Sequence, residues 1–185
     1  MRVLARLTTI FPFILIPEVL MSTAVSTASP INVGMNAPDF TLPYATRDSI
    51  AQTPLTLSAE VGKGPIVLAF YPADWSGGCT KEVCSFRDAI ADLGKSGARI
   101  WAISGDYVYS HHEWAKHHNL PFELLSDHDH AVARLYDSFN PEKGLNNRTV
   151  YVVDSRGIVA YVNPQYNVAD SHDFEALRAA LAKIK

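Results

Sequence analysis

Two largely apolar runs of strand length stand out along the chain. Residues 65–71 read PIVLAFY and residues 98–104 read ARIWAIS, and both are rich in β-branched and aromatic side chains. Apolar runs of this length without polar alternation are typical of strands that are buried on both faces of a sheet. We therefore predict two parallel strands at the centre of the fold.

Between these runs the apolar residues recur at three- and four-residue steps. Val83, Phe86, Ile90 and Leu93 follow this spacing, which predicts a helix over residues 79–93. A strand, a helix and a second parallel strand in this order form a right-handed crossover.

The remaining pattern predicts an α/β fold with a central mixed β-sheet and helices on both faces, in one domain from residue 33 to 185. Residues 55–65 are expected to form a strand edge, a turn and a loop. Ser171 is expected to cap the last helix. The other expected elements are helices at 110–120, 130–139 and 171–185, a short strand at 122–126, and a hairpin of strands at 148–154 and 158–162.

The N-terminus follows a different pattern, which is basic, then apolar, then rich in small residues. This order is typical of a secretory signal peptide, although Glu18 interrupts the apolar part. We predict a signal over residues 1–28, cleaved after Ala24 or Ala28, and export to the periplasm or outside the cell, with a cytoplasmic location as the alternative. The apolar run is short and contains two prolines, so no stable membrane insertion is expected after cleavage.

The length and net charge of the chain indicate how many domains it forms and which partners it lacks. The chain has 185 residues, which suits one domain, and its formal net charge is −3. That charge gives no electrostatic footprint for nucleic acid, so we expect no nucleic-acid partner.

The chain holds two cysteines, Cys79 and Cys84, where the first apolar run gives way to the helix. Cys79 falls in the first helical turn after a buried strand, where free N–H groups and the helix dipole favour a thiolate. A thiolate attacks a peroxide oxygen and becomes a sulfenic acid.

The spacing of the two cysteines keeps their sulfur atoms apart in an intact helix. Residues five apart have Cα atoms about 8–9 Å apart, whereas a disulfide needs them within about 7 Å. The two thiols can therefore bond only if the helix locally unwinds. A cysteine on a helix is also often a small buried hydrophobic residue, and this alternative stays open for Cys84.

The segment FYPADWSGGCTKEVCSFRD, residues 70–88, resembles the active-site segment of the peroxiredoxin (AhpC/TSA) family. The family pattern is proline, three residues, threonine or serine, two residues and cysteine, and here it is Pro72, Ser76 and Cys79. The spacing in CTKEVC is similar to that of the bacterioferritin-comigratory, or Q-type, subfamily. Further resemblance lies in GMNAPDFTLP, in WAISGDYVYSHHEWAKHHNLPFELLSD and in RTVYVVDSRG, which carries Arg148.

The resemblance implies a thioredoxin-like fold and a thiol-dependent peroxidase that reduces hydrogen peroxide and organic hydroperoxides. Cys79 would be the peroxidatic nucleophile and Cys84 the resolving thiol. Arg148 would stabilise the thiolate, Ser76 would hydrogen-bond the thiolate and the peroxide, and Pro72 would shield the pocket from water. A thioredoxin-like dithiol would be the reductant, no cofactor is implied, and a monomer is expected because resolution needs no second subunit.

Two departures from the family pattern bear on the pocket. Ser76 replaces the commoner threonine, and Gly77-Gly78 replaces a loop that more often contains proline, so a looser pocket is expected.

The alternative function is an exported thioredoxin-like module for copper binding or disulfide exchange. Such copper sites use two cysteines and a distant histidine, and disulfide exchange favours Cys-x-x-Cys, so both usually need closer thiols than Cys79 and Cys84. The histidines of the expected helix at 110–120 are not spaced three or four apart, so no metal site is predicted there, and His111 is not assigned to catalysis.

Overall fold

A six-stranded mixed sheet forms the centre of the molecule. The computed structural model describes residues 30–93 and 96–184. The strand order is β10-β9-β4-β5-β6-β2. Strands β4, β5 and β6 are parallel to one another, and the others pair antiparallel. The strands span Tyr44–Ala45 (β2), Ile66–Phe70 (β4), Arg99–Ser104 (β5), Glu123–Ser126 (β6), Thr149–Val153 (β9) and Val159–Asn163 (β10).

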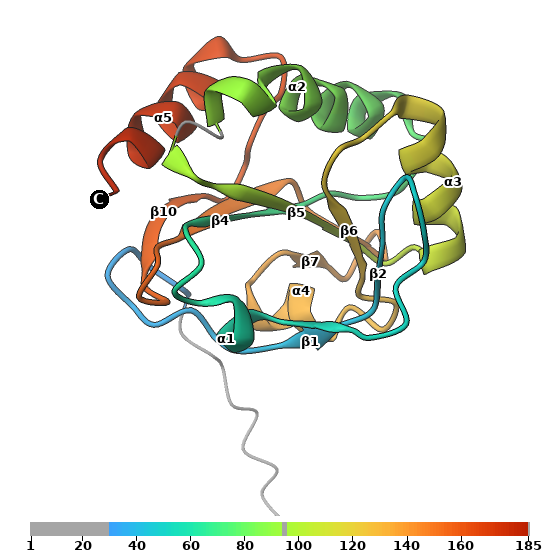
Figure 1. Cartoon of the computed structure of the whole chain (residues 1–185), viewed down its shortest axis with the longest axis horizontal. Helices are drawn as coiled ribbons and strands as arrows, with labels where there is room; N and C mark the ends of the chain where they lie inside the picture. Colours follow the sequence, from blue (N-terminus) through green and yellow to red (C-terminus); the bar gives the residue numbers. More distant parts are fainter. Residues whose placement is uncertain (1–29, 94–95, 185) are drawn as a thin grey trace, which may run out of the picture.

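Helices cover both faces of this sheet, as the sequence predicts (Figure 1). One face is covered by α2 (Gly77–Leu93), α3 (Val108–His118) and α5 (Ser171–Ala182). The opposite face is covered by α4 (Ala131–Leu135), the short α1 (Leu57–Glu60) and the segment that begins at Ile31.

Strand β4 shows why its sequence has no polar alternation. Ile66, Leu68 and Phe70 pack into the core on the side of α4. Val67 and Ala69 pack into the other core, on the side of α2. All five residues are buried, so the prediction of a strand buried on both faces is confirmed.

The structure differs from the sequence predictions mainly in short elements. The expected turn after residue 56 is a helical turn, α1, which follows the short strand β3 (Leu55–Thr56) paired with β1 (Thr41–Leu42). The helix expected at 130–139 is shorter in the structure, where α4 ends at Leu135. Phe139, which was expected to be helical, begins β7 (Phe139–Asn140), and β7 pairs with β8 (Leu145–Asn146).

The cap of α5 is a second small correction. The N-cap is Asp170 and not Ser171, because the Asp170 side chain accepts a hydrogen bond from the backbone N–H of His172.

The predicted signal peptide, residues 1–28, lies outside the described residues. Within residues 30–93 and 96–184, no helix is both long and apolar enough to cross a membrane.

Candidate active site

Cys79 lies in the first turn of α2, at the carboxyl end of β4, and its side chain is fully buried. The Ser76 hydroxyl donates to its Sγ over 2.6 Å. Arg148, the residue just before β9, donates to the same sulfur from Nη2 over 3.4 Å. Three of the five residues singled out by the resemblance therefore meet at one sulfur atom. A permanent positive charge and a hydroxyl donor at that atom suit a thiolate.

Arg148 is held in place by Glu82, which sequence reasoning missed. Arg148 Nη1 forms an ion pair with Glu82 Oε2, while Glu82 is only 1% exposed and Arg148 is 26% exposed. Burial raises the pKa of Glu82 to about 7, although Arg148 acts in the opposite direction. One feature of the sequence could have indicated Glu82. It follows Cys79 by three residues, and residues three apart on a helix lie on neighbouring parts of its surface.

We expect Glu82→Gln to flatten the pH dependence of stability. The folded-state pKa of Glu82, about 7, lies above its ordinary value of 4.5, so the folded protein binds this proton more tightly than the unfolded chain does. The stabilisation is thus complete below about pH 4.5 and is lost as the pH rises to about 7, by up to about 3 kcal/mol. Urea unfolding at several pH values measures it. Equal pH dependence in wild type and Glu82→Gln would contradict the expectation, and Glu175→Gln, which removes an exposed carboxylate, is the control.

Gly78 allows Arg148 to approach the helix closely. A Cβ atom at Gly78 would lie 2.8 Å from Arg148 Nη2, closer than real Cβ contacts. Gly77 and Gly78 also form the first residues of α2 rather than part of a loop. The glycine that sequence reasoning took as a sign of a looser pocket thus has a steric role beside the guanidinium.

Cys84 lies in the same continuous helix as Cys79, and both thiols are free. Cys84 is partly buried, so it is more accessible than Cys79. The helix between them is intact, which means that a bond between these sulfur atoms requires local unwinding of α2. Pro72 is partly buried in the loop between β4 and α2.

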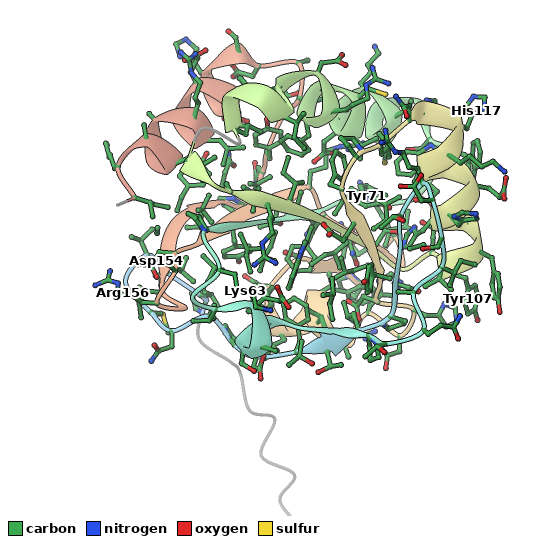
Figure 2. All side chains as sticks on the ribbon, viewed as in Figure 1. Lys63, Tyr71, Tyr107, His117, Asp154 and Arg156 are labelled. Atoms are coloured by element: carbon green, nitrogen blue, oxygen red, sulfur yellow. The ribbon has the colours of Figure 1, made fainter. Side chains whose placement is uncertain are left out.

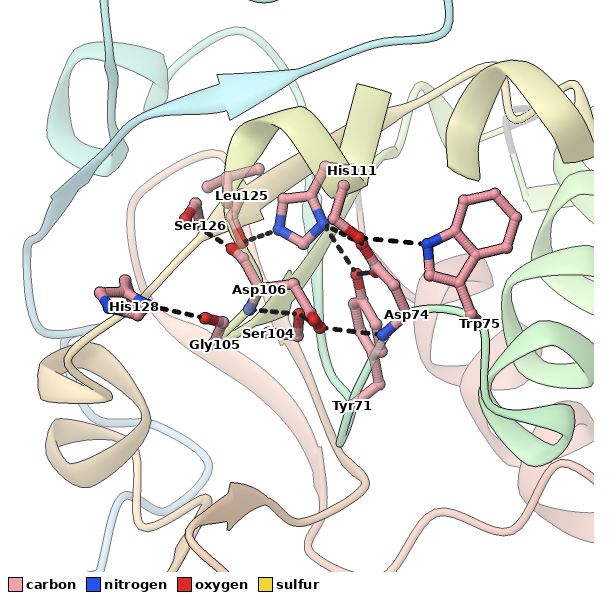
Figure 3. A network of polar contacts seen from close by, with 11 residues as sticks. Tyr71, Asp74, Trp75, Ser104, Gly105, Asp106, His111, Leu125, Ser126 and His128 are labelled. Atoms are coloured by element: carbon pink, nitrogen blue, oxygen red, sulfur yellow. Dashed lines mark hydrogen bonds and ion pairs between the residues drawn. The ribbon is translucent and has the colours of Figure 1, made fainter. Parts of the chain in front are cut away.

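That loop is supported by a buried polar network that no local sequence pattern indicated (Figure 3). Asp74 Oδ2 lies 2.9 Å from His111 Nδ1, and Asp74 Oδ1 accepts a hydrogen bond from the Tyr71 hydroxyl over 2.7 Å. Figure 2 shows Tyr71 in the interior of the molecule, whereas His117 lies at the outer edge of α3. The network joins residues more than thirty positions apart in the sequence, which is why spacing alone does not reveal it. Among the described residues, no group of three or more His, Cys, Asp or Glu side chains could hold a metal ion.

A buried thiol at a helix start, contacted by a hydroxyl and a guanidinium on a thioredoxin-like sheet, defines a thiol-based redox enzyme. The model of the AhpC/TSA family matches residues 33–162 of this chain. The chain therefore belongs to the AhpC/TSA family of peroxiredoxins, which are thiol-dependent peroxidases, and the predictions of family, fold and enzyme class are confirmed. Members of this family act on peroxides with thioredoxin-type reductants.

Named relatives and solved structures agree with this family. Peroxiredoxin Q, chloroplastic, from Triticum aestivum is 39% identical over 152 residues, which cover 80% of this chain and 66% of the wheat protein. The putative peroxiredoxin bcp of Coxiella burnetii is 38% identical over 154 residues, covering 80% of this chain and 97% of the relative. The crystal structure of peroxidoxin BcpB from Mycobacterium tuberculosis has 30% identity and a TM-score of 0.72, covering 84% of this chain and 99% of that one.

A further solved structure is the bacterioferritin comigratory protein of Xanthomonas campestris, described for its alkyl peroxide reduction activity. Its identity is 28% and its TM-score 0.67, with 79% of this chain and 92% of that chain covered. The copper-binding and disulfide-exchange alternative is not favoured by these matches.

The comparisons contradict the predicted export. The plant relative is named as chloroplastic, the bacterial relatives are peroxiredoxins of the bcp and Q type, and none of these names indicates export. The prediction was wrong because a basic, apolar and small-residue order describes a composition, and composition alone does not fix the compartment to which a protein goes.

Proposed function

We propose that Cys79 is the peroxidatic nucleophile of this thiol peroxidase and that Cys84 resolves its oxidised form. The observation that carries the proposal is the pair of donors on one buried sulfur, Ser76 Oγ at 2.6 Å and Arg148 Nη2 at 3.4 Å. Both donors can also reach an oxygen that approaches this sulfur, so the same groups serve the thiolate and the peroxide.

The first step is a displacement at oxygen. The Cys79 thiolate attacks the nearer peroxide oxygen, an S–O bond forms, and the O–O bond breaks. The departing oxygen takes a proton and leaves as water or an alcohol, and Cys79 becomes a sulfenic acid. Arg148 and Ser76 stabilise the negative charge that moves from sulfur to the departing oxygen, and Pro72 limits the access of water to it.

The second step joins the two cysteines. The Cys84 thiolate attacks the sulfenic sulfur, an S–S bond forms and the sulfenic oxygen leaves as water after taking a proton. This step requires the first part of α2 to unwind, because the helix holds the thiols apart. A thioredoxin-like dithiol then exchanges with the disulfide and restores both thiols. Since resolution is internal to one chain, the working unit is a monomer comprising the domain at 33–185, which sedimentation analysis tests.

The substrates are hydrogen peroxide and small organic hydroperoxides. Arg148 also lines a cleft of about 520 Å³ together with Phe139, Pro164 and Tyr166. Asp137, Asn147 and Gln165 also line this cleft, so it offers a small, largely polar hydroperoxide a place next to the guanidinium. The alkyl peroxide reduction described for the Xanthomonas campestris protein supports the same substrate class.

The test is peptide mapping of the reduced protein after one equivalent of hydrogen peroxide. Free thiols are alkylated, the protein is digested without reductant, and the peptides are identified by mass spectrometry. A rapid Cys79–Cys84 disulfide supports both roles. Two unreacted thiols would contradict the peroxidase function, and a sulfinic acid at Cys79 beside a free Cys84 would contradict internal resolution.

We expect Cys84→Ser to separate the two steps. Oxidation of Cys79 should proceed within about threefold of the wild-type rate, because Cys84 does not touch the reacting sulfur. The sulfenic acid should then persist, add a dimedone label and pass to sulfinic acid, while turnover with a dithiol falls. Ser85→Ala, at the next position of α2, is the control. Wild-type turnover by Cys84→Ser would show that resolution does not use this thiol.

A further inference from the structure

A buried pair of side chains outside the reacting groups connects the active-site loop to α3. The carboxylate of Asp74 and the imidazole of His111 are both fully buried, with Oδ2 and Nδ1 2.9 Å apart (Figure 3). Asp74 lies two residues before Ser76, and His111 lies in α3. We propose that this pair is a positioning element, which fixes the loop so that the Ser76 hydroxyl reaches the Cys79 sulfur. The proposal rests on the proposed function of Cys79.

The hydrogen-bond partners fix the orientation of both side chains of the pair. His111 Nε2 lies 3.2 Å from the Leu125 carbonyl oxygen, which can only accept, so Nε2 carries a proton. The other ring nitrogen faces the Asp74 carboxylate. The Asp74 carboxyl group also accepts hydrogen bonds from the hydroxyls of Tyr71 and Ser110, each over 2.7 Å. The Tyr71 hydroxyl lies 3.4 Å from His111 Nδ1 as well, so Asp74, His111 and Tyr71 hold one another in place.

A second carboxylate holds the backbone of the same loop. Asp106 Oδ2 accepts the backbone N–H of Asp74 over 2.9 Å and the Ser104 hydroxyl over 2.7 Å. The next residue, Trp75, has a φ of 59°, in the left-handed region that is unfavourable for a bulky side chain. Its indole N–H donates to Ser110 Oγ over 3.2 Å. The loop thus keeps a strained conformation only because neighbouring groups hold it.

A series of hydrogen bonds connects Asp74 to the reacting sulfur through this loop. The Asp74 carbonyl accepts the backbone N–H of Ser76 over 2.8 Å, and the Ser76 carbonyl accepts the N–H of Thr80 over 2.9 Å. Ser76 Oγ then lies 2.6 Å from the sulfur of Cys79. A displacement of Asp74 would move this hydroxyl, and a misplacement of about 1 Å can cost on the order of a hundredfold in rate.

Asp74→Asn tests the pair because it keeps the shape and removes the charge. The measurement is the second-order rate of Cys79 oxidation by hydrogen peroxide, obtained by competition with a haem peroxidase. We expect about a tenfold decrease in this rate. In a Ser76→Ala background the same substitution should change the rate by less than about twofold, because the hydroxyl that the pair positions is gone. Equal losses in both backgrounds would overturn the proposal. His111→Gln tests the pair from α3 if Asp74→Asn does not fold.

The matched control is a buried carboxylate that supports another part of the fold. Asp127 accepts the backbone N–H groups of Val132 and Ala133, over 3.1 and 2.7 Å, at the start of α4. Asp127→Asn should reduce stability and leave the rate of Cys79 oxidation unchanged. A tenfold loss of rate in this control would mean that general loosening explains the effect of Asp74→Asn, and the proposal would fail.

Two measurements test this proposal independently of the proposed peroxidase function. Alkylation of Cys79 by iodoacetamide needs no peroxide, so it reports the placement of the sulfur even in a protein that consumes none. Asp74→Asn should change the alkylation rate in the wild-type background and not in Ser76→Ala. Nitrogen-15 NMR of labelled histidine rings should show one ring with a slowly exchanging Nε2–H proton, absent in His111→Gln. If no ring holds such a proton, the buried contacts of His111 are wrong, whatever the peroxidase assay shows.

Discussion

Replacing Cys79 by serine should abolish peroxide consumption. A serine hydroxyl at this position remains protonated at neutral pH and is a poor nucleophile towards peroxide oxygen, whereas a thiolate is a strong one. We expect the rate to fall by at least about a thousandfold, as when the nucleophile of other enzymes is removed. The measurement is the consumption of hydrogen peroxide by the pre-reduced protein, followed over a single turnover so that no external reductant is needed.

The design of this experiment distinguishes chemistry from folding. Serine is close to cysteine in volume, and Cys79 packs among the buried side chains of the core that includes Val83 and Phe86, so a modest loss of stability is expected. Circular dichroism and urea unfolding show whether the variant is folded. Cys84→Ser is the matched thiol control, since it removes one thiol and leaves Cys79 in place. An unchanged rate in folded Cys79→Ser would refute the assignment of the nucleophile.

The central fold could be predicted from the sequence because its signals are local. The run that became β4 has no polar interruption, and the run that became β5 has polar residues only at its ends, Arg99 and Ser104. The spacing from Val83 to Leu93 follows the buried face of α2. The element β3 lies where the sequence predicted a strand edge, but the short elements β1, β2, β7 and β8 were missed. Each contains only two residues, and its pairing is set by a partner elsewhere in the chain rather than by its own pattern.

The site was predictable to the extent that a motif carried it. Ser76 and Cys79 lie within one segment, and Arg148 came from a second segment through family resemblance. Glu82 was missed because it lies in a helix with one polar face. In such a helix the residue type alone does not show whether a glutamate is buried or exposed. Asp74 and His111 were missed for another reason, since their contact exists only after β4 and α3 are packed together.

Arg148→Met should slow the oxidation of Cys79 by about a hundredfold to a thousandfold. Methionine removes the cation that donates to the Cys79 sulfur over 3.4 Å, and with it a donor to the departing oxygen. Removing one preorganised donor to developing negative charge costs this much in other enzymes. The fraction of thiolate at neutral pH should also fall, which ultraviolet absorbance of the thiolate measures. Arg148→Lys should recover only part of the rate, because an ammonium group cannot bridge Glu82 and Cys79 with a planar fork.

The partner of Arg148 determines how this loss should be interpreted. Removing the guanidinium leaves Glu82 buried without its counter-ion, which destabilises a protein by about 3–5 kcal/mol if the carboxylate stays charged. The double variant Arg148→Met, Glu82→Gln removes that stranded charge, so it should regain stability without regaining rate. Recovery of both together would mean that Arg148 acts by supporting the fold. Recovery of stability alone means that the guanidinium acts on the sulfur and the peroxide, as the contact with Cys79 indicates.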